Sequence, residues 1–421
     1  MAIGRLPWTG AQARSVNSML NHAVIGTGSR GLGHVRNFDS TKNCRVIAVC
    51  DVDPERLEKA AGIPAASSRV RKYSDYRKLL ENVQVDSVSI ATCDHWHAPI
   101  ALAAILAGKH VYIEKPCSHN IHEANLLVKA AVEYKRCVQH GTQRRSSAED
   151  AAAVRAIRDG LIGEVYLAKA VNHQRRQPIG RARPEAPPPG VDYDMWLGPA
   201  PEHPFTRNRW HYNWHWFWDY GGGDLVNDGI HQLDGAVWGL GLDRNYPSAI
   251  ISSGGQLWYD DDHQTPDTQN ITYEFARDTG PTKMIIYEMR LWTPYKLEGH
   301  DNGTVFYGTQ GTVHVGRGKP KAHLDDRQVE INPGQYGIEL EGIIPNFIRA
   351  CLEDDPSRLN SPIQVGAFST ILCHLGNIGT RCGGGRISYE PKKERVSGEG
   401  EGLANQLIRG KDRQGYELIY G

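Results

Sequence analysis

The first third of the chain alternates short apolar runs with helical stretches, and this pattern changes after about residue 147. Apolar runs rich in β-branched residues predict buried strands, whereas the stretches that begin at residues 53 and 99 predict helices. Such an alternation predicts a parallel, doubly wound sheet with helices on both faces. The expected strands are residues 22–25, 45–50, 85–91, 111–113 and 137–140.

The later part of the chain has the pattern of a different α/β unit. Short runs alternate apolar and polar residues with turn residues between them, which predicts antiparallel strands. Helices are expected over residues 221–240, 338–352 and 362–380, and a surface loop over the proline- and arginine-rich residues 177–189. We therefore expect a large, mostly antiparallel open sheet here. Its expected strands are residues 249–252, 270–275, 283–289, 304–307 and 312–315.

These two patterns set the domain boundaries that we predict. A chain of 421 residues exceeds the size at which a single core keeps growing, so two domains are expected. We place the parallel-sheet domain at residues 21–147 and the second α/β domain at residues 148–396. Residues 1–20 are expected to form an N-terminal tail. Residues 397–421 contain few apolar positions and are expected to lie on the surface or against a neighbouring subunit.

A glycine-rich turn follows the first expected strand. Its glycines are spaced as GxGxxG, and Asp51 ends the second expected strand. In dinucleotide sites such glycines allow a tight turn, a close approach of the pyrophosphate and close helix packing, while the acid binds the adenosine ribose. The order therefore predicts a Rossmann domain that binds NAD at a helix N-terminus. Its predicted cofactor-binding residues are Gly26, Gly28, Ser29, Arg30, Gly31 and Asp51.

Asp51 also bears on the choice between NAD and NADP. A 2′-phosphate would meet this carboxylate with like-charge repulsion, so NAD is favoured. Arg30 and Arg56 could hold a 2′-phosphate, so NADP stays the less favoured alternative.

Polar residues follow two further strands of the expected parallel sheet. Residues 92–97 follow one strand, and Glu114 and Lys115 follow another. Ligands bind at the carboxyl ends of such strands, so both groups should face the same mouth as the glycine turn. A lysine beside nicotinamide can exchange a proton with a substrate hydroxyl, although an ordinary surface lysine is the alternative. We assign Thr92, His95, His97, Glu114 and Lys115 to the cofactor and Trp96 to the substrate.

A second polar cluster begins the helix expected over residues 221–240. Asn227 and His231 are four residues apart, and Asp228 and His231 are three apart, so on a helix they share a face. A histidine beside an amide or carboxylate suits a general base with an orienting partner. The alternative is a histidine that only caps the helix. We therefore predict that Lys115, His231, Asn227 and Asp228 are catalytic.

Residues 210–220 form an unusually aromatic block, WHYNWHWFWDY. Sugar rings stack on tryptophan and tyrosine faces, and the polar residues between them can bind hydroxyl groups. An aromatic core beneath the sheet is the alternative, and both can hold for different tryptophans. We predict that His211, Asn213, Trp214, Trp216, Asp219 and His231 bind substrate, with Tyr212 and His215 as further catalytic candidates.

Composition and charge exclude several classes of protein. The 48 basic and 48 acidic residues balance, which argues against nucleic acid or an anionic membrane as the main partner. No apolar stretch is long enough to span a membrane. The eight cysteines are scattered without a CxxC pair and are expected to be reduced core residues, and no metal is expected. Residues 1–20 do not form an intact signal peptide, so we expect a cytoplasmic protein; an exported protein with its signal trimmed is the alternative.

Four segments together resemble the Gfo/Idh/MocA oxidoreductases, the relatives of glucose–fructose oxidoreductase and inositol dehydrogenase. They are GTGSRG at residues 26–31, the histidine-bearing loop at 92–97, AGKHVYIEKP at 107–116 and GGG…GIHQLD at 221–234. The stretches at 192–201 and 211–224 resemble a bacterial subgroup whose members are often exported by the twin-arginine route. The resemblance covers residues 22–390.

The resemblance implies a Rossmann domain, an α/β domain whose open sheet often serves in oligomer contacts, NAD(P), and sugars or polyols as substrates. By motif, Lys115 matches the family's lysine and His231 its histidine. The family usually has aspartate four residues before that histidine, where this chain has Asn227. Because an amide cannot act as a base, the usual aspartate-assisted proton relay is in doubt here.

Three hypotheses follow. The first is an NAD-dependent oxidoreductase that acts on a secondary hydroxyl, at C3 of a sugar or glycoside. The second is an NAD-dependent glycosidase that oxidises C3 transiently, eliminates the aglycone, adds water and restores the hydride. The third, a cofactor-binding protein without catalysis, is disfavoured by the Lys115/His231 pair. The expected partners are a small sugar or glycoside and further copies of the chain, as a homodimer or homotetramer.

Overall fold

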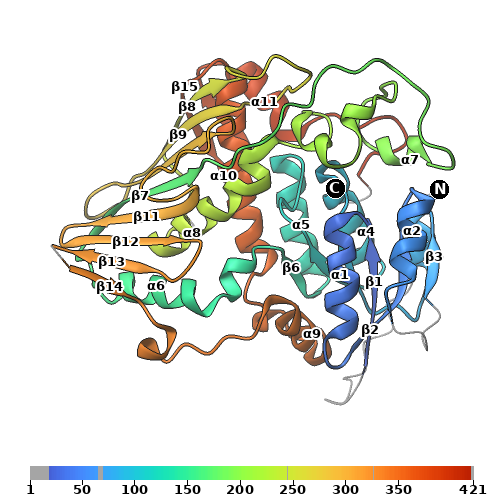
Figure 1. The fold of residues 1–421 in the computed structure, drawn as a ribbon, viewed down its shortest axis with the longest axis horizontal. Coiled ribbons are helices and arrows are strands. Elements are labelled where there is room, and N and C mark those ends of the chain that lie inside the picture. Colours follow the sequence, from blue (N-terminus) through green and yellow to red (C-terminus); the bar gives the residue numbers. More distant parts are fainter. Residues whose placement is uncertain (1–18, 65–69, 244, 326, 419–421) are drawn as a thin grey trace.

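The computed structural model describes residues 19–64, 70–243, 245–325 and 327–418. Most of the expected N-terminal tail, residues 1–18, lies outside the described residues. The first sheet has six parallel strands in the order β3-β2-β1-β4-β5-β6, with helices on both faces (Figure 1). This confirms the expected parallel, doubly wound domain. Its strands are β1 (Leu20–Ile25), β2 (Cys44–Cys50), β3 (Arg71–Tyr73), β4 (Ser87–Ile90), β5 (His110–Ile113) and β6 (Val138–His140).

Helices connect these strands. Ser29–Ser40 forms α1 directly after the glycine turn, and Asp53 caps α2 by accepting hydrogen bonds from the main-chain N–H groups of residues 55 and 56. Residues 94–97 were expected to form a loop, but they are the first turn of α4. A helical turn sends successive side chains in different directions, which decides below where each of them points. The helices of this part are α1 (Ser29–Ser40), α2 (Pro54–Ala61), α3 (Tyr76–Leu80), α4 (Asp94–Leu106) and α5 (Ile121–Glu133).

The second sheet has ten strands in the order β14-β13-β12-β11-β7-β10-β9-β8-β15-β16. The pair β7–β10 is parallel and the other ladders are antiparallel, so the expected mostly antiparallel sheet is confirmed. The strands are β7 (Val165–Asn172), β8 (Ala249–Gly255), β9 (Thr268–Phe275), β10 (Lys283–Arg290), β11 (Asn302–Gly308), β12 (Gly311–Gly316), β13 (Lys321–Leu324), β14 (Arg327–Glu330), β15 (Gly385–Glu390) and β16 (Arg395–Gly398).

The sequence patterns missed β7, which lies in the centre of this sheet between β11 and β10. Its sequence, VYLAKAVN, alternates only weakly, because Val171 and Asn172 at its end are both buried. Helices α8 and α10 cover one face of the sheet (Figure 1). Gly239 of α8 permits close packing, since a Cβ atom there would lie 2.3 Å from Phe306 Cε1. The remaining α-helices are α6 (Ala148–Arg158), α7 (Tyr193–Leu197), α8 (Ile230–Leu240), α9 (Ile343–Glu353), α10 (Ile363–Arg381) and α11 (Glu401–Arg409).

Two segments of the C-terminal part lie where the sequence patterns did not place them. Helix α9, expected in the second domain, packs on the core of the first sheet, where the Phe347 ring contacts His22, Phe38 and Tyr112. The expected C-terminal surface tail instead contains β16 and α11. Only two apolar side chains of α11, Ala404 and Ile408, are fully buried, and they share one helix face. No helix among the described residues is long and apolar enough to cross a membrane.

Candidate active site

The glycine turn between β1 and α1 is shaped as a cradle. Gly26 has φ +81°, and a Cβ atom there would lie 2.7 Å from the main-chain carbon of Ala91. A Cβ atom at Gly31 would lie 1.9 Å from the main-chain oxygen of Gly26. Gly28 is the N-cap of α1 and offers no side-chain cap, which leaves the first N–H groups of the helix available for a phosphate. These residues fit the dinucleotide predicted from the sequence.

Asp51 lies at the end of β2 and lines the same cavity. Its Oδ2 atom accepts hydrogen bonds from the main-chain N–H of Thr27 at 2.6 Å and from Thr27 Oγ1 at 3.0 Å, while Oδ1 accepts one from the N–H of Asp53 at 3.0 Å. Burial raises the pKa of Asp51 and these bonds partly offset the rise. The carboxylate therefore fixes the glycine turn, and its remaining lone pairs face the cavity.

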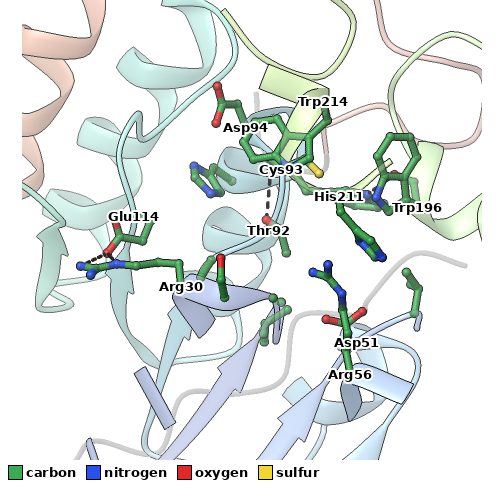
Figure 2. Close-up of a pocket in the computed structure, with 18 of the residues that line it drawn as sticks. Arg30, Asp51, Arg56, Thr92, Cys93, Asp94, Glu114, Trp196, His211 and Trp214 are labelled. Atoms are coloured by element: carbon green, nitrogen blue, oxygen red, sulfur yellow. Dashed lines mark hydrogen bonds and ion pairs between the residues drawn. The ribbon is translucent and has the colours of Figure 1, made fainter. Parts of the chain in front are cut away.

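Arg56 is a cation at the adenosine end of this cavity. A Cβ atom at Gly28 would lie 2.5 Å from Arg56 Nη1, so the guanidinium lies against the turn. Arg56 Nε is 3.6 Å from Asp53 Oδ2, and His211 Nε2 is 3.8 Å from the same oxygen. Figure 2 shows Arg56 beside Asp51, with His211 opposite the guanidinium.

Glu114 at the end of β5 holds α1 to the sheet. Its Oε1 atom accepts hydrogen bonds from Arg30 Nε at 2.6 Å and from Gln143 Nε2 at 3.3 Å, and lies 3.0 Å from His34 Nε2 (Figure 2 draws the Arg30 pair). Burial opposes the charged form, but His34 and Arg30 outweigh burial and hold the pKa of Glu114 far below its usual range. Glu114 thus touches the cavity with a carboxylate that is already paired.

One cavity of about 460 Å³ runs from the glycine turn to α8. It brings together most of the residues that the sequence indicated, from both domains. Those that line it are Gly26, Gly28, Ser29, Arg30, Asp51, Thr92, Trp96, His97, Glu114, Lys115, His211, Tyr212, Trp214, His215, Asn227 and His231.

Six indicated residues do not line this cavity: Gly31, His95, Asn213, Trp216, Asp219 and Asp228. His95 and Asp219 instead line a second cavity of about 240 Å³, which shares no lining residue with the first. Asp219 Oδ2 lies 3.0 Å from His203 Nε2, and His95 Nε2 lies 3.1 Å from the main-chain oxygen of Trp196. His95 lies outside the first cavity because the helical start of α4 turns its ring away from that of His97.

Lys115 is the centre of the polar end of the first cavity. Its Nζ atom donates hydrogen bonds to the Asn227 main-chain oxygen at 2.5 Å and to Asn227 Oδ1 at 2.9 Å. The amide group of Asn227 is oriented from the other side, since Nδ2 donates to Asp224 Oδ1 at 3.0 Å and to the Tyr212 hydroxyl at 3.3 Å. Asn227 therefore positions the ammonium group of Lys115.

His231 follows on α8 and lines the cavity beside Lys115. Burial, reinforced by the positive charge of Lys115, lowers the pKa of His231 to about 4. Its imidazole is thus neutral at pH 7 and able to accept a proton. Asn227 lies in a single π-helical turn, Leu225–Gly229, that directly precedes α8, and such turns are frequent at functional sites.

Two carboxylates lie behind Asn227, and of these the sequence patterns indicated Asp228 but missed Asp224. Asp224 is fully buried and accepts hydrogen bonds from Arg176 Nη2 at 2.8 Å and Asn172 Nδ2 at 2.9 Å. Arg176 also donates to Asp228, so one guanidinium bridges both carboxylates. Burial would raise the pKa of Asp228, but Lys115 and Arg176 outweigh it and the pKa is lowered. Asp228 stays charged and supports the site from outside the cavity.

The aromatic block divides between core and cavity. Trp216 is buried, lies outside the cavity lining and has Arg176 6.0 Å from its ring centroid, which agrees with the core alternative for this residue. Trp214 lines the cavity and stacks on His215, with ring centroids 3.6 Å apart. Trp196 from α7 completes the wall beside Trp210 (Figure 2 labels Trp196 and Trp214). The sequence patterns did not indicate Trp196, because residues 192–201 carry a family resemblance but no local pattern of a binding site.

Comparison with known proteins shows which family this chain matches. Residues 20–142 match the model of an oxidoreductase family with an NAD-binding Rossmann fold, and residues 177–325 match the C-terminal α/β domain of the same family. The chain is 28% identical over 152 residues to a "Glycosyl hydrolase family 109 protein" from Shewanella pealeana, covering 35% of this chain and 33% of that protein. It is 33% identical over 194 residues to "Inositol 2-dehydrogenase" from Arthrobacter sp., covering 45% and 53%.

The similar segments thus span only about a third to a half of these relatives. Among solved structures, an inositol dehydrogenase homolog from Azotobacter vinelandii, complexed with NADH and myo-inositol, shares the fold with a TM-score of 0.67 at 18% identity, over 88% of this chain and 98% of that one. Both family models fall on the two sheets in the expected order. This chain belongs to the Gfo/Idh/MocA family of oxidoreductases and carries the family's NAD-binding Rossmann domain.

Proposed function

We propose that the protein is an NAD-dependent oxidoreductase that acts on a secondary ring hydroxyl, at C3 of a sugar or glycoside. The observation that carries this proposal is the single cavity that joins the dinucleotide cradle to Lys115, Asn227 and His231. A nicotinamide ring that extends from the cradle along this cavity meets the only described lysine that lines it. The cavity thus offers a cofactor end and an acid–base end in one space.

Bound NAD supplies the acceptor for the hydride that leaves the carbon bearing the hydroxyl group. The chain's own residues handle the proton of that hydroxyl. His231 is neutral and accepts it, while the ammonium group of Lys115 binds the oxygen and stabilises the negative charge that develops there. Asn227 and Asp224 hold the lysine in place through their hydrogen bonds.

The aromatic wall supports a sugar as the substrate. Trp196, Trp210 and Trp214 line the cavity together with His211 and His215. Rings of this kind stack on the C–H faces of sugars, while imidazoles bind hydroxyl groups. The names of similar proteins agree, because inositol dehydrogenases and a levoglucosan dehydrogenase are among them.

A redox-cycling glycosidase is the second candidate. Several similar proteins are named "Glycosyl hydrolase family 109 protein", and the first cavity holds a further neutral base. Burial lowers the pKa of His215 to about 3, and its Nδ1 atom lies 2.5 Å from the Tyr212 main-chain oxygen. His215 can therefore take a C2 proton after C3 has been oxidised. The chemistry would return the hydride, so no reduced cofactor accumulates.

A two-channel assay separates the candidates. Free sugars, polyols and aryl glycosides are added with excess NAD, and NADH absorbance and aglycone release are followed together. NADH that accumulates in step with substrate loss supports the oxidoreductase and removes support for the glycosidase. Catalytic aglycone release without NADH supports the glycosidase. Neither signal across the panel, with NAD shown to bind, would overturn both.

A further inference from the structure

Asp94 is a buried carboxyl group in the active cavity that neither the family resemblance nor the sequence patterns assign. It begins α4, lines the cavity with Lys115 and Trp214, and is 2% exposed. Figure 2 shows its side chain beside the Trp214 ring, on the opposite side of the site from Asp51 and Arg56. This places the carboxyl group near the sugar wall and away from the adenosine end.

The surroundings of this carboxyl group leave one oxygen free. The main-chain N–H of Gly222 donates a hydrogen bond to it, but Oδ2 has no hydrogen-bond partner among the described residues. A buried polar atom without a partner costs free energy, and a ligand in the cavity that Asp94 lines can supply the missing partner. The Gly222 contact comes from the glycine-rich loop that precedes α8, so this hydrogen bond ties the carboxyl group to that loop.

The protonation state of Asp94 follows from burial. Burial raises its pKa well above the usual range, and the nearby charge of Lys115 offsets the rise only in part. Burial therefore favours the protonated form of the group, which is the form that a general acid needs before the reaction. His231, by contrast, is neutral and unprotonated. The cavity thus holds two groups whose pKa values burial shifts in opposite directions, upward for Asp94 and downward for His231.

We infer that Asp94 is a further catalytic residue, a general acid whose Oδ2–H group hydrogen-bonds the glycosidic oxygen of a bound glycoside and protonates it as the bond to C1 breaks. The inference rests on the glycosidase form of the proposed function. It identifies the substrate as a glycoside with a poor leaving group, because a phenolate needs no such proton.

The reaction has two halves, elimination of the aglycone and addition of water. After C3 is oxidised, His215 takes the C2 proton, the C–H pair becomes the C1=C2 double bond, and the C1–O bond breaks. The electrons of that bond and the Asp94 proton leave with the aglycone as an alcohol. In the return direction the oxygen of a water molecule bonds to C1 while the Asp94 carboxylate takes a proton from that water. His215 then returns its proton to C2. The net reaction is hydrolysis.

The test compares Asp94→Asn with wild type on glycosides of one sugar that carry a nitrophenol or an aliphatic alcohol. Asparagine keeps the shape and can still accept the Gly222 hydrogen bond. General acid catalysis contributes about 100-fold or more, so cleavage of the alkyl glycoside should fall by about that factor. Cleavage of the nitrophenyl glycoside should fall by less than about fivefold, since that leaving group departs without a proton.

Three checks keep the result interpretable. Asp278→Asn, the same change at an exposed position outside the cavity, should leave both rates unchanged. NAD titration by fluorescence should show that Asp94→Asn binds the cofactor as wild type does. Infrared difference spectra of the two proteins at pH 7 should show a protonated carboxyl band that the variant lacks.

Equal losses for both leaving groups, or no protonated carboxyl band, would overturn the role of Asp94. A wild type that forms NADH but releases no aglycone would overturn it as well, while the oxidoreductase proposal would stand. A wild type that does neither contradicts the proposed function itself, and only then do both proposals fail together.

Discussion

Lys115 Nζ lies 2.9 Å from Asn227 Oδ1, so an amide holds the central cation of the site. The Asn227 amide is in turn fixed by Asp224, whose oxygen lies 3.0 Å from Asn227 Nδ2. An amide between an ammonium and a carboxylate fixes their orientation but neither takes up nor releases a proton at neutral pH. The proton must therefore move through His231, Lys115 or substrate.

Loss of the Lys115 ammonium should abolish turnover. Lys115→Met keeps much of the chain length but removes the charge that binds the reacting oxygen, so kcat should fall by about 1000-fold. NAD affinity, measured by fluorescence titration, should change by less than about threefold, because the cradle is formed by other residues. Lys392→Met, an exposed change distant in sequence, serves as the control. Full activity in Lys115→Met would exclude Lys115 from the catalytic machinery.

Asn227→Asp should destabilise the protein. The new carboxylate would lie about 3 Å from Asp224, and two buried like charges at that distance cannot both stay ionised. We expect a loss of about 2 kcal/mol or more in the free energy of unfolding, measured by urea denaturation. Adding Asp224→Asn to this variant should recover part of the lost free energy of unfolding. If the single variant is as stable as wild type, the Asn227–Asp224 contact is not the constraint described here.

Asp51 and Arg56 should have opposite effects on cofactor choice. Asp51→Ala removes both the acceptor for the ribose and the charge that repels a 2′-phosphate, so the kcat/KM ratio of NAD to NADP should fall by about tenfold or more. Arg56→Ala should raise this ratio, because the guanidinium beside Gly28 is the cation available to a 2′-phosphate. Steady-state kinetics with both cofactors test the pair. An unchanged ratio in both variants would remove these residues from cofactor selection.

The acid limb of the rate profile should lie well below the usual histidine range. Burial and Lys115 lower the pKa of His231 to about 4, so the base stays neutral down to that pH. A plot of log kcat/KM against pH should be flat from about pH 5 to pH 7 and fall near pH 4, over the range in which the protein stays folded. A limb near the ordinary value of about 6.5 would exclude His231 as a buried neutral base.

Acid should destabilise the fold through three other histidines. Burial lowers the pKa of His95, His140 and His374 to about 3 each. The unfolded chain takes up these protons below about pH 6.5 and the native state does not, so stability is full above pH 6.5 and falls as the pH drops towards 3. Between pH 6.5 and 5 each histidine should cost about 2 kcal/mol. Calorimetry at several pH values tests this slope, which His374→Gln should reduce.

The sequence by itself determined the parts of this protein that depend on local chemistry. A strand, a GxGxxG turn, a helix and an acid at the end of the next strand form a dinucleotide cradle because steric limits on the turn act within about 30 residues. Apolar runs and the alternation of apolar and polar residues likewise predicted five of the six strands of the first sheet and five of the ten strands of the second. Lys115 and His231 were found for a similar reason, since each follows a local motif.

Tertiary packing decided which neighbouring side chains share a cavity. The helical start of α4 sends Asp94 and His97 into the active cavity and His95 into the second one, although the three are nearly adjacent. Asp224 is held in the site in part by Asn172 of β7, a strand that weak alternation concealed. Burial, which residue type alone does not determine, favours the protonated form of Asp94 and the neutral form of His231. Desolvation and long-range contacts arise only when distant segments meet, so no local pattern encodes them.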